Sequence, residues 1–311
     1  ALVVSKYAIK GGASQLGVAT LNEGIKLRLS GLKTPILVLG NLHTKRDLIT
    51  CFKNDLMPTI SSFRECLICN NIGKHFGIKF ALHLKVDTGM SRLGFDYDQF
   101  AGQFKKIKEF ENISIRGLYS HLSSADEKNA LEENSITQLQ KRKFTHLLNQ
   151  ISIVDDTNIK IHLSNSAGMS LAKDFHFDMV RIGLSIYGYN YIENKNEKLS
   201  LQPALFLKVK VTFIRYIDKG VGVSYGSKFV SCRKTKLAVL SIGYADGINR
   251  NLSGKINVLY KNKLYPQVGS ITMDQMMVDI TNSNDIKVGS TMILLGSDGD
   301  KTISPLDWAR E

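Results

Sequence analysis

The chain has 311 residues, of which 43% are hydrophobic and 22% are charged, the composition of an ordinary soluble globular protein with room for one large and one smaller domain. Its net charge of +13 comes from 41 Lys and Arg residues that are scattered rather than gathered in a block and are not interleaved with aromatic residues, so we expect no nucleic-acid partner. No apolar run is long enough to span a membrane and no signal peptide is visible, so we expect no membrane partner and a cytoplasmic protein.

Both ends of the chain carry helical patterns. The apolar spacing from Ala1 to Ile9 is helical and stops at Gly11, with no preceding cap. Near the other end, Ser304 is a candidate cap, followed by a proline at the first helical position and by Asp307 three residues after the cap. We therefore expect both termini to be cuts through helices, so that the chain lacks its extreme ends.

Residues 1–190 alternate short apolar segments with helical ones. Such repeats predict an α/β fold with a parallel sheet, and a nearly closed strand count favours a (β/α)8 TIM-type barrel over an open sheet. The candidate strands are 15–20, 35–39, 57–61, 81–86, 115–119, 159–163 and 179–182. These are seven rather than eight, and because the chain opens in a helix, we expect the missing strand to be the first strand of the barrel.

Three of the intervening helices have recognisable signals. Asn22 is a candidate cap for a helix over 22–30, and Asp96 with Gln99 resembles a capping box for a helix over 96–110. A third helix is expected over 134–151, with a predicted apolar face of Ile136, Leu139, Leu147 and Ile151.

A pair of cysteines has the spacing of a redox or metal site. Cys66 and Cys69 lie in a helix-like segment over 63–75, but no second Cys or His pair stands at a matching distance. We therefore interpret them as buried or half-buried free thiols and expect no metal site.

A polar segment from Asn190 to Ser200 is predicted to be a linker, and the pattern changes after it. Apolar and polar residues then alternate, as in half-buried strands, and Lys261-Asn262-Lys263 is predicted to be a hairpin turn. Candidate strands are 207–213, 236–242, 255–260, 264–268, 275–280 and 291–295. The predicted domains are therefore a barrel over 1–190 and a smaller, mostly β domain over 200–311.

Polar clusters follow several barrel strands, at the end where such barrels place their functional groups. They contain Lys85 with Arg92, then His121, then Asn165-Ser166-Ala167, and then Arg181 with Gly183. Small residues, a hydroxyl and an arginine suit a phosphate cradle. Each residue alone is also explained by turn chemistry, and a lone histidine is more often structural than catalytic.

Two segments of the second domain break a strand pattern with polar residues. Tyr244 ends an apolar strand in Ser241-Ile-Gly-Tyr-Ala-Asp-Gly247, and Met273 lies in Gly269-Ser-Ile-Thr-Met-Asp-Gln-Met276. A tyrosine at such a place is usually the edge of a core, but a nearby cation could lower its pKa enough for proton transfer.

Together these segments closely resemble the alanine racemase family, whose members use pyridoxal 5′-phosphate (PLP). The strongest signatures are 84–94, 165–167, 180–188, 241–247 and 269–275, and the resemblance covers essentially the whole chain. It implies interconversion of L- and D-alanine by two-base proton transfer, which supplies D-alanine for peptidoglycan. It also implies a homodimer in which each active site joins the barrel of one subunit to the β domain of the other.

The resemblance also implies roles for individual residues. Tyr244 would be the acid/base on one face of the substrate, with His121 tuning it, and Met273 would hold the substrate carboxylate through its backbone amide. Arg92 would lie near the cofactor and the substrate carboxylate, held by Lys85, which is often carbamylated in the family. Arg181 would face the pyridine nitrogen, and the remaining cofactor-binding positions would be Asn165, Ser166, Gly183 and Leu184.

The second base of the family is a lysine that also anchors PLP and ends the first barrel strand. This chain has no such motif, and Lys6 and Lys10 fall inside the following helix, so the role is transferred to neither. Two alternatives therefore stay open. One is a catalytically inactive fragment that keeps the fold for PLP-phosphate binding or dimerisation, and the other is a racemase for another amino acid such as serine.

Overall fold

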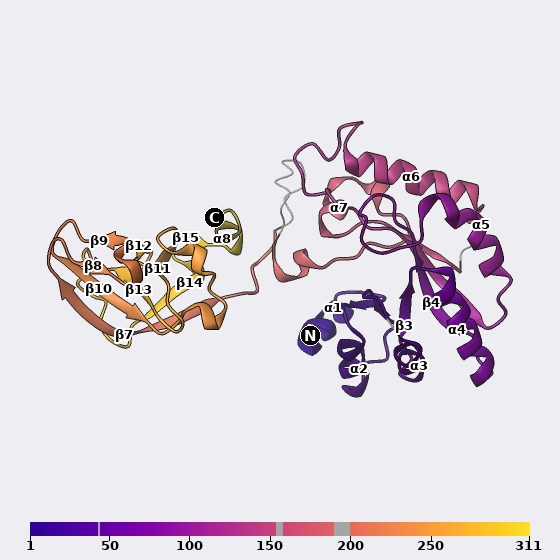
Figure 1. Ribbon diagram of the computed structural model, residues 1–311, viewed down its shortest axis with the longest axis horizontal. Helices are drawn as coiled ribbons and strands as arrows, with labels where there is room; N and C mark the ends of the chain where they lie inside the picture. Colours follow the sequence, from indigo (N-terminus) through magenta and orange to yellow (C-terminus); the bar gives the residue numbers. More distant parts are fainter. Residues whose placement is uncertain (43, 154–157, 190–199) are drawn as a thin grey trace. The chain divides into compact units, whose positions relative to one another are not determined.

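A computed structural model describes residues 1–42, 44–153, 158–189 and 200–311. The chain divides into two compact units, Ala1–Leu201 and Gln202–Glu311 (Figure 1). Residues 190–199 of the predicted linker lie outside the described residues. In the part of the chain that is described, no helix has the length and apolar character needed to cross a membrane.

The first unit contains a parallel sheet in which strands adjacent in sequence are adjacent in space, β1 to β6 in order. The strands alternate along the chain with helices, as the sequence predicted, and α3 to α6 run along the outside of the sheet (Figure 1). The strands are β1 Leu16–Val18, β2 Ile36–Val38, β3 Met57–Ile60, β4 Phe80–Lys85, β5 Ile113–Tyr119 and β6 Lys160–His162. The helices are α1 Leu2–Lys10, α2 Leu21–Leu29, α3 Lys45–Lys53, α4 Phe63–Phe76, α5 Tyr97–Lys108, α6 Ile136–Gln150 and α7 Ser166–Leu171.

The prediction of a seventh strand over 179–182 is wrong, because these described residues form no strand. Met179 makes only an isolated parallel bridge with His162 of β6, and the Arg181 amide donates to the Ser164 carbonyl. No ladder develops because a 3-10 turn over Leu184–Tyr187 begins within a few residues. The segment nevertheless runs beside β6, so it carries its side chains to the same end of the sheet.

Two details of the predicted helices are also corrected. Helix α2 is capped by Thr20, which forms a complete capping box with Glu23, so the proposed cap Asn22 lies inside the helix. In α6 only half of the predicted face is confirmed: Leu147 is buried and Ile151 packs against the core, whereas Ile136 and Leu139 are exposed and Gln140 is buried. Apolar periodicity misplaced the first half of this face because it assigns a glutamine to the solvent side.

The two faces of β4 have different surroundings, an apolar core on one side and buried polar residues on the other. Phe80, Leu82 and Leu84 pack into the main apolar core with the helices. His83 and Lys85 point the other way and are nevertheless buried. The inner face of the sheet therefore carries a buried polar layer, to which Thr59, Tyr119 and His162 also belong.

The second unit is built on a seven-stranded sheet in the order β11-β12-β13-β10-β7-β14-β15, with an additional β11–β14 pairing. All six predicted strands are present: β7 Leu207–Ile217, β10 Thr235–Leu240, β11 Asn257–Tyr260, β12 Lys263–Val268, β13 Met276–Asp279 and β14 Thr291–Asp298. The short strands β8 Gly222–Val223, β9 Phe229–Val230 and β15 Lys301–Ile303 were missed.

The predicted turn signals of this unit are confirmed. Lys261 and Asn262 both have positive φ, 45° and 59°, and join β11 to β12 in a two-residue hairpin. Ser304 and Asp307 form the capping box of α8, Pro305–Ala309.

The packing of α4 predicts a large effect at one helical glycine. A Cβ on Gly73 would lie 2.1 Å from the Asn112 carbonyl oxygen, which belongs to backbone that cannot easily move. We expect Gly73→Ala to lower the free energy of unfolding in urea by about 1–3 kcal/mol. The matched control is Gly102→Ala in α5, where nothing lies within 4 Å of the added atom. This control should stabilise by roughly 0.5–1 kcal/mol through its helix propensity, and equal effects at both sites would contradict the packing argument.

Candidate functional site

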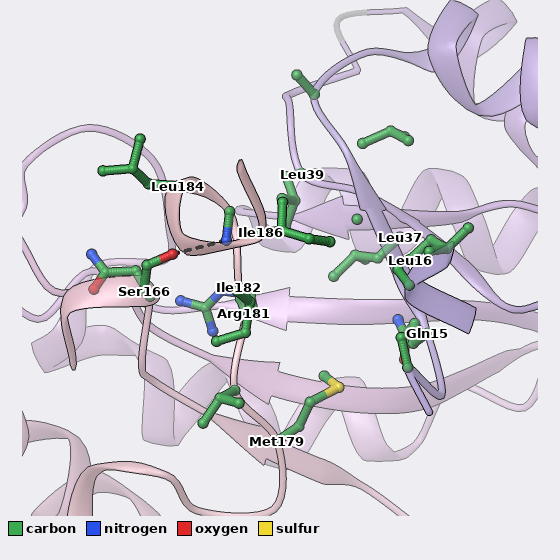
Figure 2. Close-up of a pocket in the computed structure, with 18 of the residues that line it drawn as sticks. Gln15, Leu16, Leu37, Leu39, Ser166, Met179, Arg181, Ile182, Leu184 and Ile186 are labelled. Atoms are coloured by element: carbon green, nitrogen blue, oxygen red, sulfur yellow. Dashed lines mark hydrogen bonds between the residues drawn. The ribbon is translucent and has the colours of Figure 1, made fainter. Parts of the chain in front are cut away.

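The first unit has a cavity of about 1030 Å³. Its wall is formed by α1 and β1, by the loop after β5, by the start of α7 and by residues 178–187. Figure 2 shows Ser166, Arg181 and Leu184 on one side of it and Gln15, Leu16 and Leu37 on the other. Of the predicted site residues, the cavity brings together His121, Asn165, Ser166, Arg181, Gly183 and Leu184.

One side of the cavity is a cluster of hydroxyls and backbone amides at the start of α7. Asn165 caps this helix by accepting a hydrogen bond from the Gly168 amide at 2.9 Å. The Ser166 hydroxyl oxygen accepts from the amides of Gly183 and Ser185, at 2.9 and 3.3 Å (Figure 2 draws one of these bonds). The Ser185 hydroxyl is buried and has no partner among the described residues. Of these two hydroxyls, the one that lines the cavity is that of Ser166, and it can donate to an anion there.

Arg181 is held by neutral acceptors. One terminal nitrogen donates to His162 Nδ1 at 2.7 Å, and the other donates to the carbonyls of Ser120 and Leu163, both at 2.8 Å, and to His121 Nδ1 at 3.1 Å. Burial lowers the pKa of Arg181 to about 10, which leaves the guanidinium charged at neutral pH. The cation is therefore fixed in direction, although no carboxylate bonds it among the described residues.

Burial and the same cation keep the histidines beside it neutral. Burial, reinforced by Arg181, lowers the pKa of His121 to about 3 and that of His162 well below its usual range. Since an arginine can only donate, each histidine must present an unprotonated Nδ1 to it. Both rings therefore act as hydrogen-bond acceptors at neutral pH.

Lys85 is the last residue of β4, and it is buried beside the ring of Tyr119. Its ammonium lies 5.7 Å from the ring centroid, and the Arg181 guanidinium carbon lies 4.9 Å from the same centroid. Burial first, and then the charges of Arg92 and Arg181, lower the pKa of Lys85 to about 8, with Asp87 opposing them. A substantial fraction of Lys85 is therefore uncharged slightly above neutral pH.

Arg92 lies in the loop that follows Lys85 and is exposed, and it is not among the residues lining the cavity. The Asp87 carboxylate shapes this loop by accepting from the amides of Gly89 and Met90, both at 2.8 Å. Gly94 allows the loop to return, because its φ is 136° and an added Cβ would lie 2.6 Å from the Asp87 nitrogen.

Gln140, buried in α6, ties two of these strand-end loops together. Its amide nitrogen donates to the His121 carbonyl at 3.0 Å, and its carbonyl oxygen accepts from the Ser123 amide at 2.9 Å. The same amide nitrogen lies 3.5 Å from the Thr88 hydroxyl in the loop after β4. Gln140 therefore fixes the backbone that carries His121.

The remaining predicted residues, Tyr244 and Met273, lie side by side in the second unit. The Tyr244 amide donates to the Thr272 carbonyl and the Ala245 amide donates to the Met273 carbonyl, both at 2.9 Å. Only a glycine fits at position 243, because an added Cβ would lie 2.2 Å from the Thr272 oxygen. Both side chains are exposed, so this unit presents a phenol and a thioether on its surface.

Comparison with known proteins agrees with this arrangement. The family model of the alanine racemase N-terminal domain matches residues 1–191, and that of the C-terminal domain matches residues 204–311. The chain belongs to the alanine racemase family. The resemblance found in the sequence is thereby confirmed, as is the fold of a barrel followed by a β-rich region.

Individual relatives support the assignment. The chain is 49% identical to the alanine racemase of Prochlorococcus marinus over 306 residues, which are 98% of this chain and 79% of that protein. A solved alanine racemase from Bacillus anthracis with bound L-Ala-P has a TM-score of 0.86 at 31% identity, covering 98% of this chain and 78% of that one. Another solved alanine racemase, from Bartonella henselae with covalently bound pyridoxal phosphate, has a TM-score of 0.83 at 28% identity. The match covers 94% of this chain and 79% of that one.

The cavity fits the phosphate end of the family's cofactor. The Ser166 hydroxyl, which lines the cavity, and the open space in front of Gly183, where an added Cβ would meet nothing within 4 Å, leave a donor and room for an anionic group. For a covalent anchor the described lining offers no lysine, since Lys6 and Lys10 of α1 are exposed and line no part of the cavity.

Sequence reasoning missed several residues of this site. Tyr119, His162 and Gln140 are buried members of strands or helices and carry no loop or motif signal. Ser185 lies within the 180–188 signature but was not singled out. A polar residue at an inward-facing strand position was the available signal for Tyr119 and His162.

The neutral histidines predict how stability depends on pH. Because the folded-state pKa of His121 is about 3, below the ordinary 6.5, the unfolded chain binds this proton first and stability falls as the pH drops from 6.5 toward 3. His121→Asn should make this fall shallower by about one proton, or about 1.4 kcal/mol per pH unit. Urea unfolding between roughly pH 6.5 and 4 measures it. Ser124→Ala in the same loop removes no titrating group and should keep the wild-type slope; a His121→Asn slope equal to it would contradict the assignment.

Proposed function

We propose that the protein is an alanine racemase that interconverts L- and D-alanine with PLP. Family membership and the 49% identity to a curated alanine racemase support the activity, and the observation that carries it to this chain is the cavity wall of Ser166, Arg181 and Gly183. When bound, PLP withdraws electrons from the substrate Cα and makes its proton acidic. The product, D-alanine, would serve peptidoglycan synthesis in the cytoplasm.

The barrel residues would bind and orient the cofactor. The Ser166 hydroxyl and the backbone around Gly183 and Leu184 would donate to its phosphate, with Asn165 fixing the start of α7. Arg181 would face the pyridine nitrogen. Because a guanidinium only donates and stays charged at neutral pH, it would keep that nitrogen unprotonated.

Lys85 and Arg92 would form the side that receives the substrate carboxylate. Their charges repel each other as they stand, which is one cause of the lowered pKa of Lys85. A carbamate on Lys85 would turn this repulsion into an attraction and give Arg92 a bidentate partner. The uncharged amine required for that modification is accessible because the pKa lies at about 8.

Tyr244 would move a proton at the substrate Cα, and the Met273 backbone amide would hold the carboxylate. The two residues are brought together by the backbone bonds between their segments. In the proposed homodimer they act on the cavity of the partner subunit, so each active site draws on both chains.

A second candidate function follows from the cavity lining, which contains no lysine in the described residues. The chain would then bind PLP through its phosphate without racemising any amino acid. Measuring PLP binding and racemisation separately, with alanine and serine as substrates, distinguishes this candidate from the first and reveals the substrate preference.

The role of Tyr244 predicts a specific loss of activity. Tyr244→Phe removes the phenolic proton and should lower kcat for alanine racemisation about 10²- to 10⁴-fold, with PLP binding unchanged. Circular dichroism follows the loss of optical activity from either enantiomer. Tyr216→Phe, at an exposed position of β7, is the matched control and should keep full activity. Wild-type kcat in Tyr244→Phe would rule out the proposed role. A wild-type protein that binds PLP but racemises neither alanine nor serine would favour the second candidate.

The shared sites predict recovery of activity when two inactive variants are mixed. Arg92→Ala alters the barrel part of the site and Tyr244→Phe the second-unit part. A mixed dimer would contain one intact and one doubly altered site, so random reassociation should recover about a quarter of wild-type activity. Sites formed within one chain would recover nothing, and a monomer in light scattering would equally contradict the proposal.

A further inference from the structure

We propose that His83, a buried histidine of β4 that does not line the cavity, is a positioning residue for Arg181 and acts through the ring of His162. The inference deepens the proposed function and rests on it, since the value of a fixed Arg181 comes from its place beside the cofactor. His83 Nδ1 lies 3.0 Å from His162 Nε2, and His162 Nδ1 lies 2.7 Å from Arg181. The three side chains therefore form one line of hydrogen bonds from inside the barrel to the cavity.

The direction of every proton in this line is set by Arg181. The guanidinium has no acceptor, so His162 Nδ1 must carry a lone pair, and in the neutral ring the proton lies on Nε2. That proton is donated to His83 Nδ1, which leaves the proton of His83 on its Nε2. The reverse tautomer of His162 would point an N–H at a cation. With an acceptor at position 83, both ring nitrogens of this His162 tautomer are hydrogen-bonded, Nδ1 to Arg181 and Nε2 to His83.

The neighbouring strand is shaped to hold the His83 ring. A Cβ on Gly117 of β5 would lie 2.3 Å from His83 Nδ1 and 2.5 Å from its Cε1, so only a glycine leaves room for the ring. The register between β4 and β5 shifts at this point, so that Leu82 pairs with Ile115 and His83 with Gly117. Glycine weakens a strand interior and often marks a bulge or a close approach, and here it accommodates the imidazole.

Stability alone does not explain a histidine at this position. His83 is 1% exposed, and its Nε2 has no hydrogen-bond partner among the described residues. A buried donor without a partner is unfavourable, so an apolar side chain of similar size would remove that defect. What the apolar side chain would not supply is the acceptor for His162, whose ring is fully buried and is stacked on Tyr119 with centroids 4.5 Å apart.

Three variants separate the hydrogen bond from the packing. His83→Leu removes the acceptor, and His83→Asn keeps an oxygen acceptor on a short side chain. Gly117→Ala leaves every group of the line unchanged but displaces the ring. His75→Leu, at an exposed position of α4, is the control for the loss of a histidine. Urea unfolding of each variant identifies any that do not fold.

The first readout needs neither cofactor nor activity. Nitrogen-15 NMR of the ligand-free protein should show His162 as the single Nε2–H tautomer in wild type, His83→Asn and the control. His83→Leu and Gly117→Ala should show mixed tautomers and exchange the Arg181 guanidinium protons at least about tenfold faster. An unchanged His162 tautomer and unchanged Arg181 exchange in both variants would overturn the proposal.

The second readout is the reaction itself. His83→Leu and Gly117→Ala should lower kcat for alanine racemisation about ten- to a hundredfold with little change in KM, and His83→Asn should recover most of it. If His83→Leu keeps wild-type kcat while the protein racemises alanine, the positioning role is wrong. If the wild type does not racemise alanine, the proposed function fails, and the NMR readout still decides whether His83 positions Arg181.

Discussion

A buried guanidinium held by neutral partners is the interaction on which the rest of this barrel depends. Every hydrogen bond that the described residues give Arg181 ends on a carbonyl oxygen or an imidazole nitrogen. A carboxylate would hold the cation more strongly, but it would also neutralise it. Neutral acceptors fix the direction of the guanidinium and leave its positive charge available to whatever occupies the cavity.

The properties of the surrounding residues follow from that choice. The histidines beside Arg181 must stay uncharged, and burial together with the cation ensures that they do. Tyr119 places the face of its ring against Arg181 and Lys85 and stacks on His162, so an aromatic face offers part of the compensation that a carboxylate would provide. The phenol itself is satisfied by Thr59 at 2.9 Å. Among the described residues, the inner face of the sheet is thus polar without containing an opposite charge for its cations.

The sequence predicted the parts of the structure that have local signals. Strand–helix alternation, the turn at Lys261-Asn262 and the cap at Ser304 are local, and each was found where expected. The motif residues of the cavity wall were found through their resemblance to a family. Gln140 and Thr20 were missed or misassigned because tertiary hydrogen bonds and a competing cap decided them. His83 and His162 lie within strands, where alternation can mark a polar residue as inward-facing but its hydrogen-bond partner is unknown until the strand register is known.

The excess of cations at the barrel mouth points to the chemistry that completes the site. Burial and then the charges of Arg92 and Arg181 lower the pKa of Lys85, and among the described residues only Asp87 opposes them there. Asp87, however, is already engaged with two backbone amides of its own loop. A cluster of positive groups that repel one another is unfavourable by itself. An anion that binds there reduces this repulsion, which favours its binding. The phosphate and the carboxylate of the proposed ligands, and a carbamate on Lys85, are groups of this kind. The electrostatics that weaken the isolated site therefore favour its occupied state.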